Sequence, residues 1–158
     1  MPSLHALLKQ VLHLQESPHR TALAFAVGSG IAFCPLYGFH MILVGVCTWA
    51  FKLNFIALLA GALINNPWTI VPILGATYWT GAILLGRSET PVFDWSELGF
   101  WAIYEQVMPY AVPFAVGGVV LSLIAAILSY PLALYLITKH RRSSVHGAEP
   151  LPPPKPLG

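Results

Sequence analysis

The stretch AVPFAVGGVVLSLIAAILSYPLALYLIT, residues 111–138, carries no charged side chain and limits the possible folds more than any other part of the sequence. Its 28 residues exceed the roughly 20 that an α-helix needs to cross the hydrocarbon core of a bilayer. The whole chain is 56% hydrophobic and 9% charged, against about 25% charged residues in a soluble globular domain. The sequence therefore predicts an all-α integral membrane protein, a helical bundle in which residues 111–138 form a full span.

A second apolar region lies before this span and is interrupted twice by helix-breaking residues. Pro35 and Gly38 stand in the first interruption, and Asn65–Asn66–Pro67 form the second. The apolar pieces that flank the first interruption have 12 and 13 residues, so as helices they reach only about 18–20 Å of a ~30 Å core. We therefore predict broken or re-entrant helices at 21–51 and 53–86.

Three further segments complete the predicted architecture. In residues 1–20, leucines share one side of a helical projection and polar residues the other, which predicts an amphipathic helix in the membrane interface. Acidic and aromatic residues are mixed in 94–108, which favours a surface helix at the headgroup level. The proline-rich residues 143–158 are predicted to form a disordered, solvated tail after a membrane domain that comprises 21–142.

The basic residues predict the orientation of the chain. Lys139, Arg141 and Arg142 directly follow the full span, so the positive-inside rule assigns the C-terminus to the cytoplasm. Lys9 and Arg20 favour the same side for the N-terminus. We therefore expect both termini in the cytoplasm.

The two interruptions form the candidate functional site. Unpaired backbone groups are costly in hydrocarbon, so each interruption has to be enclosed, and the other interruption is its natural partner. Asn66 and Pro67 are typical of a helix start, and Gly38 also precedes a new helix. The sequence thus predicts two helix N-termini whose free N–H groups and dipoles favour a bound anion.

The predicted substrate-binding residues are those of the two interruptions: Pro35, Tyr37, Gly38, His40, Asn65, Asn66 and Pro67. His40 either donates to the anion or remains a neutral imidazole bonded to a loop carbonyl. Asn65 and Asn66 either line the site or cap the broken backbone, and these two roles are compatible. Tyr37 either lines the site or anchors the chain at the interface.

Several other kinds of site are not expected. The apolar region holds no paired carboxylates, no cluster with metal-ligand spacing and no serine–histidine–acid arrangement, so we predict no enzyme, no metal and no cofactor. A net charge of only +2 gives no footprint for nucleic acid.

Three stretches together carry a resemblance: GSGIAFCPLYGFH at 28–40, KLN at 52–54 and NNPWTIVP at 65–72. With the P-x-x-G-x-H pattern that begins at Pro35, they resemble the domain-of-unknown-function family 2062 of small bacterial membrane proteins, over roughly residues 5–138. The resemblance implies a location in the bacterial inner membrane, and relatives are sometimes joined to polyprenyl-linked sugar transferases. It implies no reaction.

The leading hypothesis is a small transporter or flippase-like carrier for an anionic lipid or a lipid-linked phosphate. The interruptions would hold the phosphate, and apolar walls would accept the chain. We also expect the small chain to form a homo-oligomer that encloses a pathway. One alternative is a non-transporting scaffold that recruits a cytosolic envelope-biosynthesis enzyme through residues 143–158. Another alternative is a small ion channel in which backbone carbonyls of the interruptions coordinate a cation.

Overall fold

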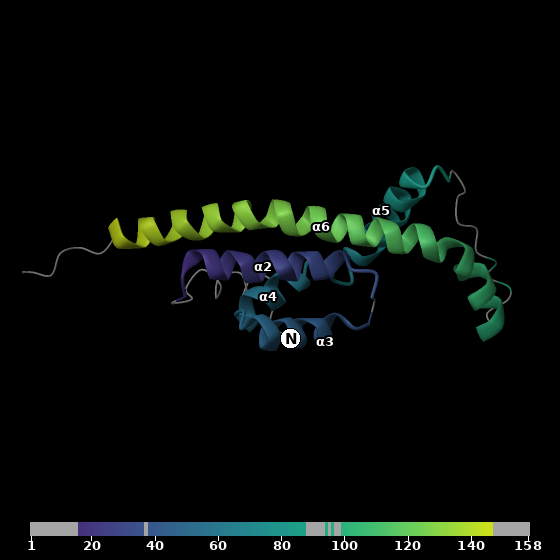
Figure 1. The fold of residues 1–158 in the computed structure, drawn as a ribbon, viewed down its shortest axis with the longest axis horizontal. Coiled ribbons are helices and arrows are strands. Elements are labelled where there is room, and N and C mark those ends of the chain that lie inside the picture. Colours follow the sequence, from purple (N-terminus) through teal and green to yellow (C-terminus); the bar gives the residue numbers. More distant parts are fainter. Residues whose placement is uncertain (1–15, 37, 88–93, 95, 97–98, 147–158) are drawn as a thin grey trace, which may run out of the picture.

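The computed structural model describes residues 16–36, 38–87, 94, 96 and 99–146, and this part of the chain consists of helices and turns without a strand. The all-α prediction is therefore confirmed for the described residues. The helices in chain order are α2, Pro18–Phe33; α3, His40–Phe51; α4, Phe55–Ala62; α5, Ile70–Leu84; and α6, Phe100–His146 (Figure 1). Most of the predicted interfacial helix 1–20 and most of the predicted tail 143–158 lie outside the described residues.

Helices end at both of the predicted interruptions. α2 stops at Phe33 and α3 begins at His40, while α4 stops at Ala62 and α5 begins at Ile70. Gly38 has a φ of 88°, a conformation that residues with a Cβ rarely adopt. A glycine at this position therefore lets the chain turn between α2 and α3.

The helices α2 and α3 form a hairpin whose two outer ends meet. The Arg20 guanidinium donates a hydrogen bond of 2.6 Å to the carbonyl oxygen of Lys52, the residue at which α3 ends. Asn54 then caps α4, because its side-chain oxygen accepts from the backbone N–H groups of Ile56 and Ala57. The turn between α3 and α4 therefore lies beside the start of α2, at the opposite end of α2 from the first interruption.

The long helix α6 runs the length of the molecule and packs against both α2 and α5 (Figure 1). A Cβ at Gly30 of α2 would stand only 3.1 Å from the α6 backbone, and Pro35 would lie 2.8 Å from a Cβ at Gly118. Nearer its N-terminus, α6 crosses α5 where Gly117 and Gly81 meet backbone to backbone. Small residues at these positions allow the close approach of the helices.

The helix α2 lies at the centre of the fold, between α4 and α6. Its buried residues are mostly alanine, glycine and serine. A Cβ at Gly28 would overlap the carbonyl oxygen of Leu58 in α4, and a Cβ at Gly61 would overlap the carbonyl oxygen of Phe25 in α2. Two glycines on facing helices thus allow α2 and α4 to touch through their backbones.

Two elements that the sequence predicts as separate are joined in the structure. The predicted surface helix 94–108 and the predicted span 111–138 share one helix, which begins at Phe100 and continues to His146. Pro109 lies between the two predicted segments; a proline there removes one helical hydrogen bond and its ring crowds the preceding turn, but the helix continues through it. The predicted boundary between surface and span is therefore not a break in the chain.

The helix α6 contains a segment, Tyr104–Arg141, that is long and apolar enough to cross a membrane, as judged by length and composition. Its most apolar window has a mean hydropathy of 2.4, and only 17% of that window is buried. Large apolar side chains are also exposed on the shorter helices α3 and α5, including Trp49 at 84% and Ile83 at 73%. The described surface is therefore predominantly apolar along three helices.

The backbone contact between α2 and α4 predicts a large difference between two glycine substitutions. In Gly28→Ala the new methyl group collides with Leu58, and overpacking of this kind destabilises proteins by about 1–3 kcal/mol. Gly45→Ala is the matched control, since a Cβ at Gly45 meets open space. Thermal unfolding of the purified variants should show a lower midpoint for Gly28→Ala only. Equal midpoints for the two variants would contradict the described packing.

Candidate functional site

The two interruptions border one common cavity of about 560 Å³, which we call the break cavity. Its walls come from the start of α3, the end of α4, the turn after α4 and the start of α5. The lining residues are Gly38, His40, Met41, Leu59, Ala62, Leu63, Asn65, Asn66, Pro67 and Ile70. None of them carries a permanent charge, and most are apolar.

Asn65 ties the second interruption to the first. Its side-chain Nδ2 donates a hydrogen bond of 3.1 Å to the carbonyl oxygen of Ala32, in the last turn of α2. The last carbonyls of a helix have no partner within the helix, and Ala32 is fully buried, so this oxygen needs a donor from elsewhere. The amide of Asn65 supplies that donor and thereby holds the two interruptions side by side.

Asn66 caps the turn that leads into α5. Its Oδ1 accepts from the backbone N–H groups of Trp68 and Thr69, at 2.9 and 3.1 Å. In return, the Thr69 hydroxyl accepts from the Asn66 backbone N–H and donates to the Ile64 carbonyl. Side chains therefore pair the N–H groups of the turn that leads into α5, whereas Thr69, the N-cap residue of α5 itself, makes no side-chain hydrogen bond to the helix.

The first turn of α3 also has no side-chain cap. The N-cap residue, Phe39, makes no side-chain hydrogen bond to the helix, so the first-turn N–H groups keep the positive end of the helix dipole. His40 occupies the first helical position, is half-buried, and has its Nε2 atom buried. The start of α3 therefore offers the positive end of a helix dipole to the break cavity.

The two asparagines retain polar atoms beyond those used for capping. Among the described residues, no partner reaches the Asn65 Oδ1 or the Asn66 Nδ2. The break cavity therefore combines an imidazole, a helix N-terminus, one amide donor and one amide acceptor with walls of Met41, Leu59 and Ile70. Such a site suits a ligand that has a polar group and an apolar part.

The structure brings together most of the residues that the sequence singles out. Gly38, His40, Asn65, Asn66 and Pro67 line the break cavity. Pro35 lies elsewhere, against α6, and Tyr37 lies outside the described residues. Sequence reasoning missed the apolar walls, which come from α3, α4 and α5: Met41, Leu59, Ala62, Leu63 and Ile70.

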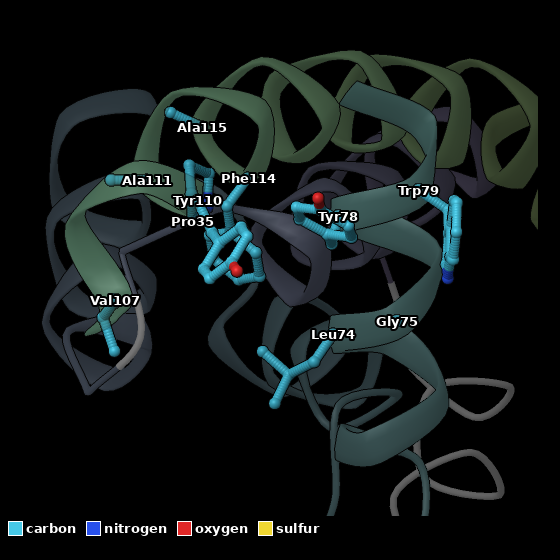
Figure 2. Close-up of a pocket in the computed structure, with 10 residues that line it drawn as sticks. All are labelled: Pro35, Leu74, Gly75, Tyr78, Trp79, Val107, Tyr110, Ala111, Phe114 and Ala115. Carbon is cyan, nitrogen blue, oxygen red and sulfur yellow. The ribbon is translucent and has the colours of Figure 1, made fainter. Parts of the chain in front are cut away.

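A second cavity of about 640 Å³, the aromatic cavity, lies between α5, α6 and Pro35 (Figure 2). The rings of Tyr78 and Tyr110 meet edge to face across it, with centroids 5.7 Å apart. Its other lining residues are Leu74, Gly75, Trp79, Val107, Ala111, Phe114 and Ala115. The sequence gives no signal for this cavity, because its two walls are about 30 residues apart along the chain.

Among the described residues, no aspartate or glutamate lines either cavity. Within the described part of the chain, no group of three or more His, Cys, Asp or Glu side chains is arranged to hold a metal ion. The exposed Asp94 accepts from the Ser96 hydroxyl and backbone N–H, and these hydrogen bonds hold the pKa of its carboxyl below the usual value.

A family model described as "Uncharacterized protein conserved in bacteria (DUF2062)" matches residues 2–146. This match covers every described helix and both interruptions. No curated protein and no solved structure shows significant similarity to the chain.

The hydrogen bond between Asn65 and Ala32 predicts a defined loss of stability when the donor is removed. In Asn65→Leu the buried carbonyl of Ala32 is left unpaired, which costs about 1–3 kcal/mol. Thermal unfolding should therefore show a lower midpoint than for the unsubstituted protein. A leucine variant with an unchanged midpoint would contradict the role given to Asn65.

Asn65→Asp provides a matched test at nearly the same shape. Only a protonated aspartic acid can donate to the Ala32 oxygen, so folding should raise the pKa of this new carboxyl. A raised folded-state pKa means that the stabilisation is present below the unfolded pKa and is lost as the pH rises through the folded one. The variant should therefore recover stability towards acidic pH, whereas Asn65→Leu should not.

Proposed function

The chain belongs to this bacterial family, whose description assigns no activity. From the geometry of the candidate site, we propose that the protein is a small membrane carrier for an anionic lipid or a lipid-linked phosphate. The observation that carries the proposal is the break cavity, where both interruptions meet.

The exposed apolar surface supports a location in the bacterial inner membrane. Monomeric soluble proteins rarely expose contiguous apolar patches larger than a few hundred Å². Here α6 exposes Ile127 at 68% and Leu128 at 65%, and α5 exposes Val71 at 72%. Hydrocarbon would cover these side chains without penalty, and the length of α6 suits a crossing helix.

The hairpin of α2 and α3 fits a re-entrant arrangement. Arg20 and Lys52 mark its outer end, where charged side chains would reach the headgroups. From Arg20 to Phe33 the helix advances by 13 residues, which corresponds to about 20 Å. With Arg20 at the surface, the break cavity would lie inside a hydrocarbon core of ~30 Å.

The chemistry of the break cavity favours an anionic group over a cation. His40, the uncapped start of α3 and the Asn66 amide can all donate hydrogen bonds, and no carboxylate from the described part of the chain lines the cavity. In contrast, two carbonyl oxygens at the interruptions, of the kind that a cation would need, already accept one hydrogen bond each. The Ala32 oxygen accepts from Asn65, and the Ile64 oxygen accepts from Thr69. These contacts favour the carrier over the ion-channel alternative.

Two substitutions test the proposal by removing donors while keeping the fold. Asn66→Asp retains the oxygen that caps α5, but it replaces the donor with a negative charge. His40→Ala removes the imidazole. Hydrogen bonds to charged groups contribute about 1.5–3 kcal/mol, so each variant should bind phosphatidic acid roughly 10- to 100-fold more weakly. Affinity would be measured by native mass spectrometry of the detergent-solubilised protein.

His19→Ala serves as the control, because His19 lies at the start of α2, remote from the break cavity. It should leave phosphatidic acid binding unchanged. The same variants would then be compared for lipid transfer across proteoliposomes. Undiminished binding by folded His40→Ala and Asn66→Asp proteins would rule out anion recognition at this site.

A further inference from the structure

The aromatic cavity has no role in the proposed recognition of an anion. Its walls are aliphatic and aromatic side chains, and no residue with a charged side chain contributes to them. Its volume of about 640 Å³ lies in the ordinary range for small-molecule sites, roughly 300–1,000 Å³. Trp79 is 44% exposed and Val107 is 43% exposed, so the cavity is open at the surface formed by α5 and α6. A ligand of this cavity would therefore be a hydrocarbon group.

The two cavities are lined by different residues of the same two segments, the turn between α2 and α3 and the helix α5. Gly38 lines the break cavity and Pro35 lines the aromatic cavity, so the turn between α2 and α3 borders both. On α5, Ile70 belongs to the break cavity, whereas Leu74 and Tyr78 belong to the aromatic cavity. These three residues are spaced four apart and lie on one face of the helix, one turn after another. From Ile70 to Tyr78 the helix rises only about 12 Å.

We propose that the aromatic cavity holds the hydrocarbon chain of the same lipid whose anionic group occupies the break cavity. The inference rests on the proposed function and narrows its substrate class to an amphiphile with a phosphate-like head and a flexible chain. The hydrocarbon chain would run from one cavity to the other along Ile70, Leu74 and Tyr78 on one face of α5. The open side of the aromatic cavity, in the proposed setting, would face the acyl chains of the bilayer.

Glycine and alanine positions on both walls permit a test that fills the aromatic cavity. A Cβ at Gly75 meets open space, so Gly75→Leu places a new side chain there without a collision with the backbone. Ala115→Leu fills the same cavity from α6. The matched controls are Gly45→Leu and Ala50→Leu, which add the same groups at exposed positions of α3 that line neither cavity. All four full-length variants would first be compared for thermal stability.

Three probes distinguish binding of the lipid's hydrocarbon chains from binding of its anionic head group. They are dioleoyl phosphatidic acid, dioleoylglycerol and glycerol 3-phosphate. Gly75→Leu and Ala115→Leu should each weaken the binding of both dioleoyl lipids by about tenfold or more. Their binding of glycerol 3-phosphate should stay unchanged, and the two controls should bind all three probes normally. Native mass spectrometry reports each affinity on the same sample.

The outcomes distinguish this inference from the proposed function. If Gly75→Leu and Ala115→Leu both bind dioleoyl lipids normally, the aromatic cavity does not hold the hydrocarbon chain. This conclusion would hold even if His40→Ala still weakens phosphatidic acid binding. An equal loss of glycerol 3-phosphate binding would also overturn the inference, since the effect would then not concern the chain. If His40→Ala leaves phosphatidic acid binding unchanged while Gly75→Leu and Ala115→Leu lose dioleoylglycerol binding, the aromatic cavity does bind a hydrocarbon chain. The proposed recognition of an anion in the break cavity is then wrong.

Discussion

The structure depends on pairing the backbone groups that the two interruptions release. In an apolar environment water does not hydrogen-bond a broken helix, so every freed carbonyl and N–H needs a partner within the protein. Asn65 meets this need for the end of α2, and Asn66 meets it for the start of α5. Because the Asn65 bond joins one interruption to the other, the same contacts that stabilise the broken backbone also create the break cavity.

The long helix α6 determines where this cavity lies. Glycines on α2, α5 and α6 allow backbones to touch, so α2 and α5 are fixed against one continuous support. The helix α3 is held differently, since Val44 is its one buried residue. It nevertheless carries His40 at its first position. We therefore expect α3 to be the helix that moves most easily relative to the others.

Local sequence signals predict part of this arrangement. Pro35 with Gly38, and Asn66 with Pro67, mark the interruptions because their backbone preferences act over a few residues. Local signals do not predict that Asn65 bonds to α2 while Asn66 caps the following turn, since the partner of Asn65 is 33 residues away. Sequence spacing also does not show that the Asn66 side chain caps the turn before α5 rather than the first turn of the helix itself.

The remaining features depend on contacts between distant segments. The predicted boundary between 94–108 and 111–138 is absent, because α6 continues through Pro109 and Pro113, and Pro113 packs against Gly81 of α5. The aromatic cavity forms only because α5 and α6 cross at Gly81 and Gly117, which brings Tyr78 beside Tyr110. No local pattern in the chain encodes that crossing, whereas the apolar composition of the helices is plain from the sequence alone.

Cross-linking in native membranes tests the central claim that the two interruptions share one cavity. Met41 and Pro67 line the break cavity from α3 and from the turn before α5, and both are exposed enough to react. With Cys34 and Cys47 replaced by alanine, a short dimaleimide should join Met41→Cys to Pro67→Cys within one chain, as mapped by peptide mass spectrometry. Met41→Cys paired with Ile83→Cys, at the far end of α5, should remain unlinked. If Met41→Cys and Pro67→Cys both react with the reagent but stay unlinked to each other, the shared cavity does not exist.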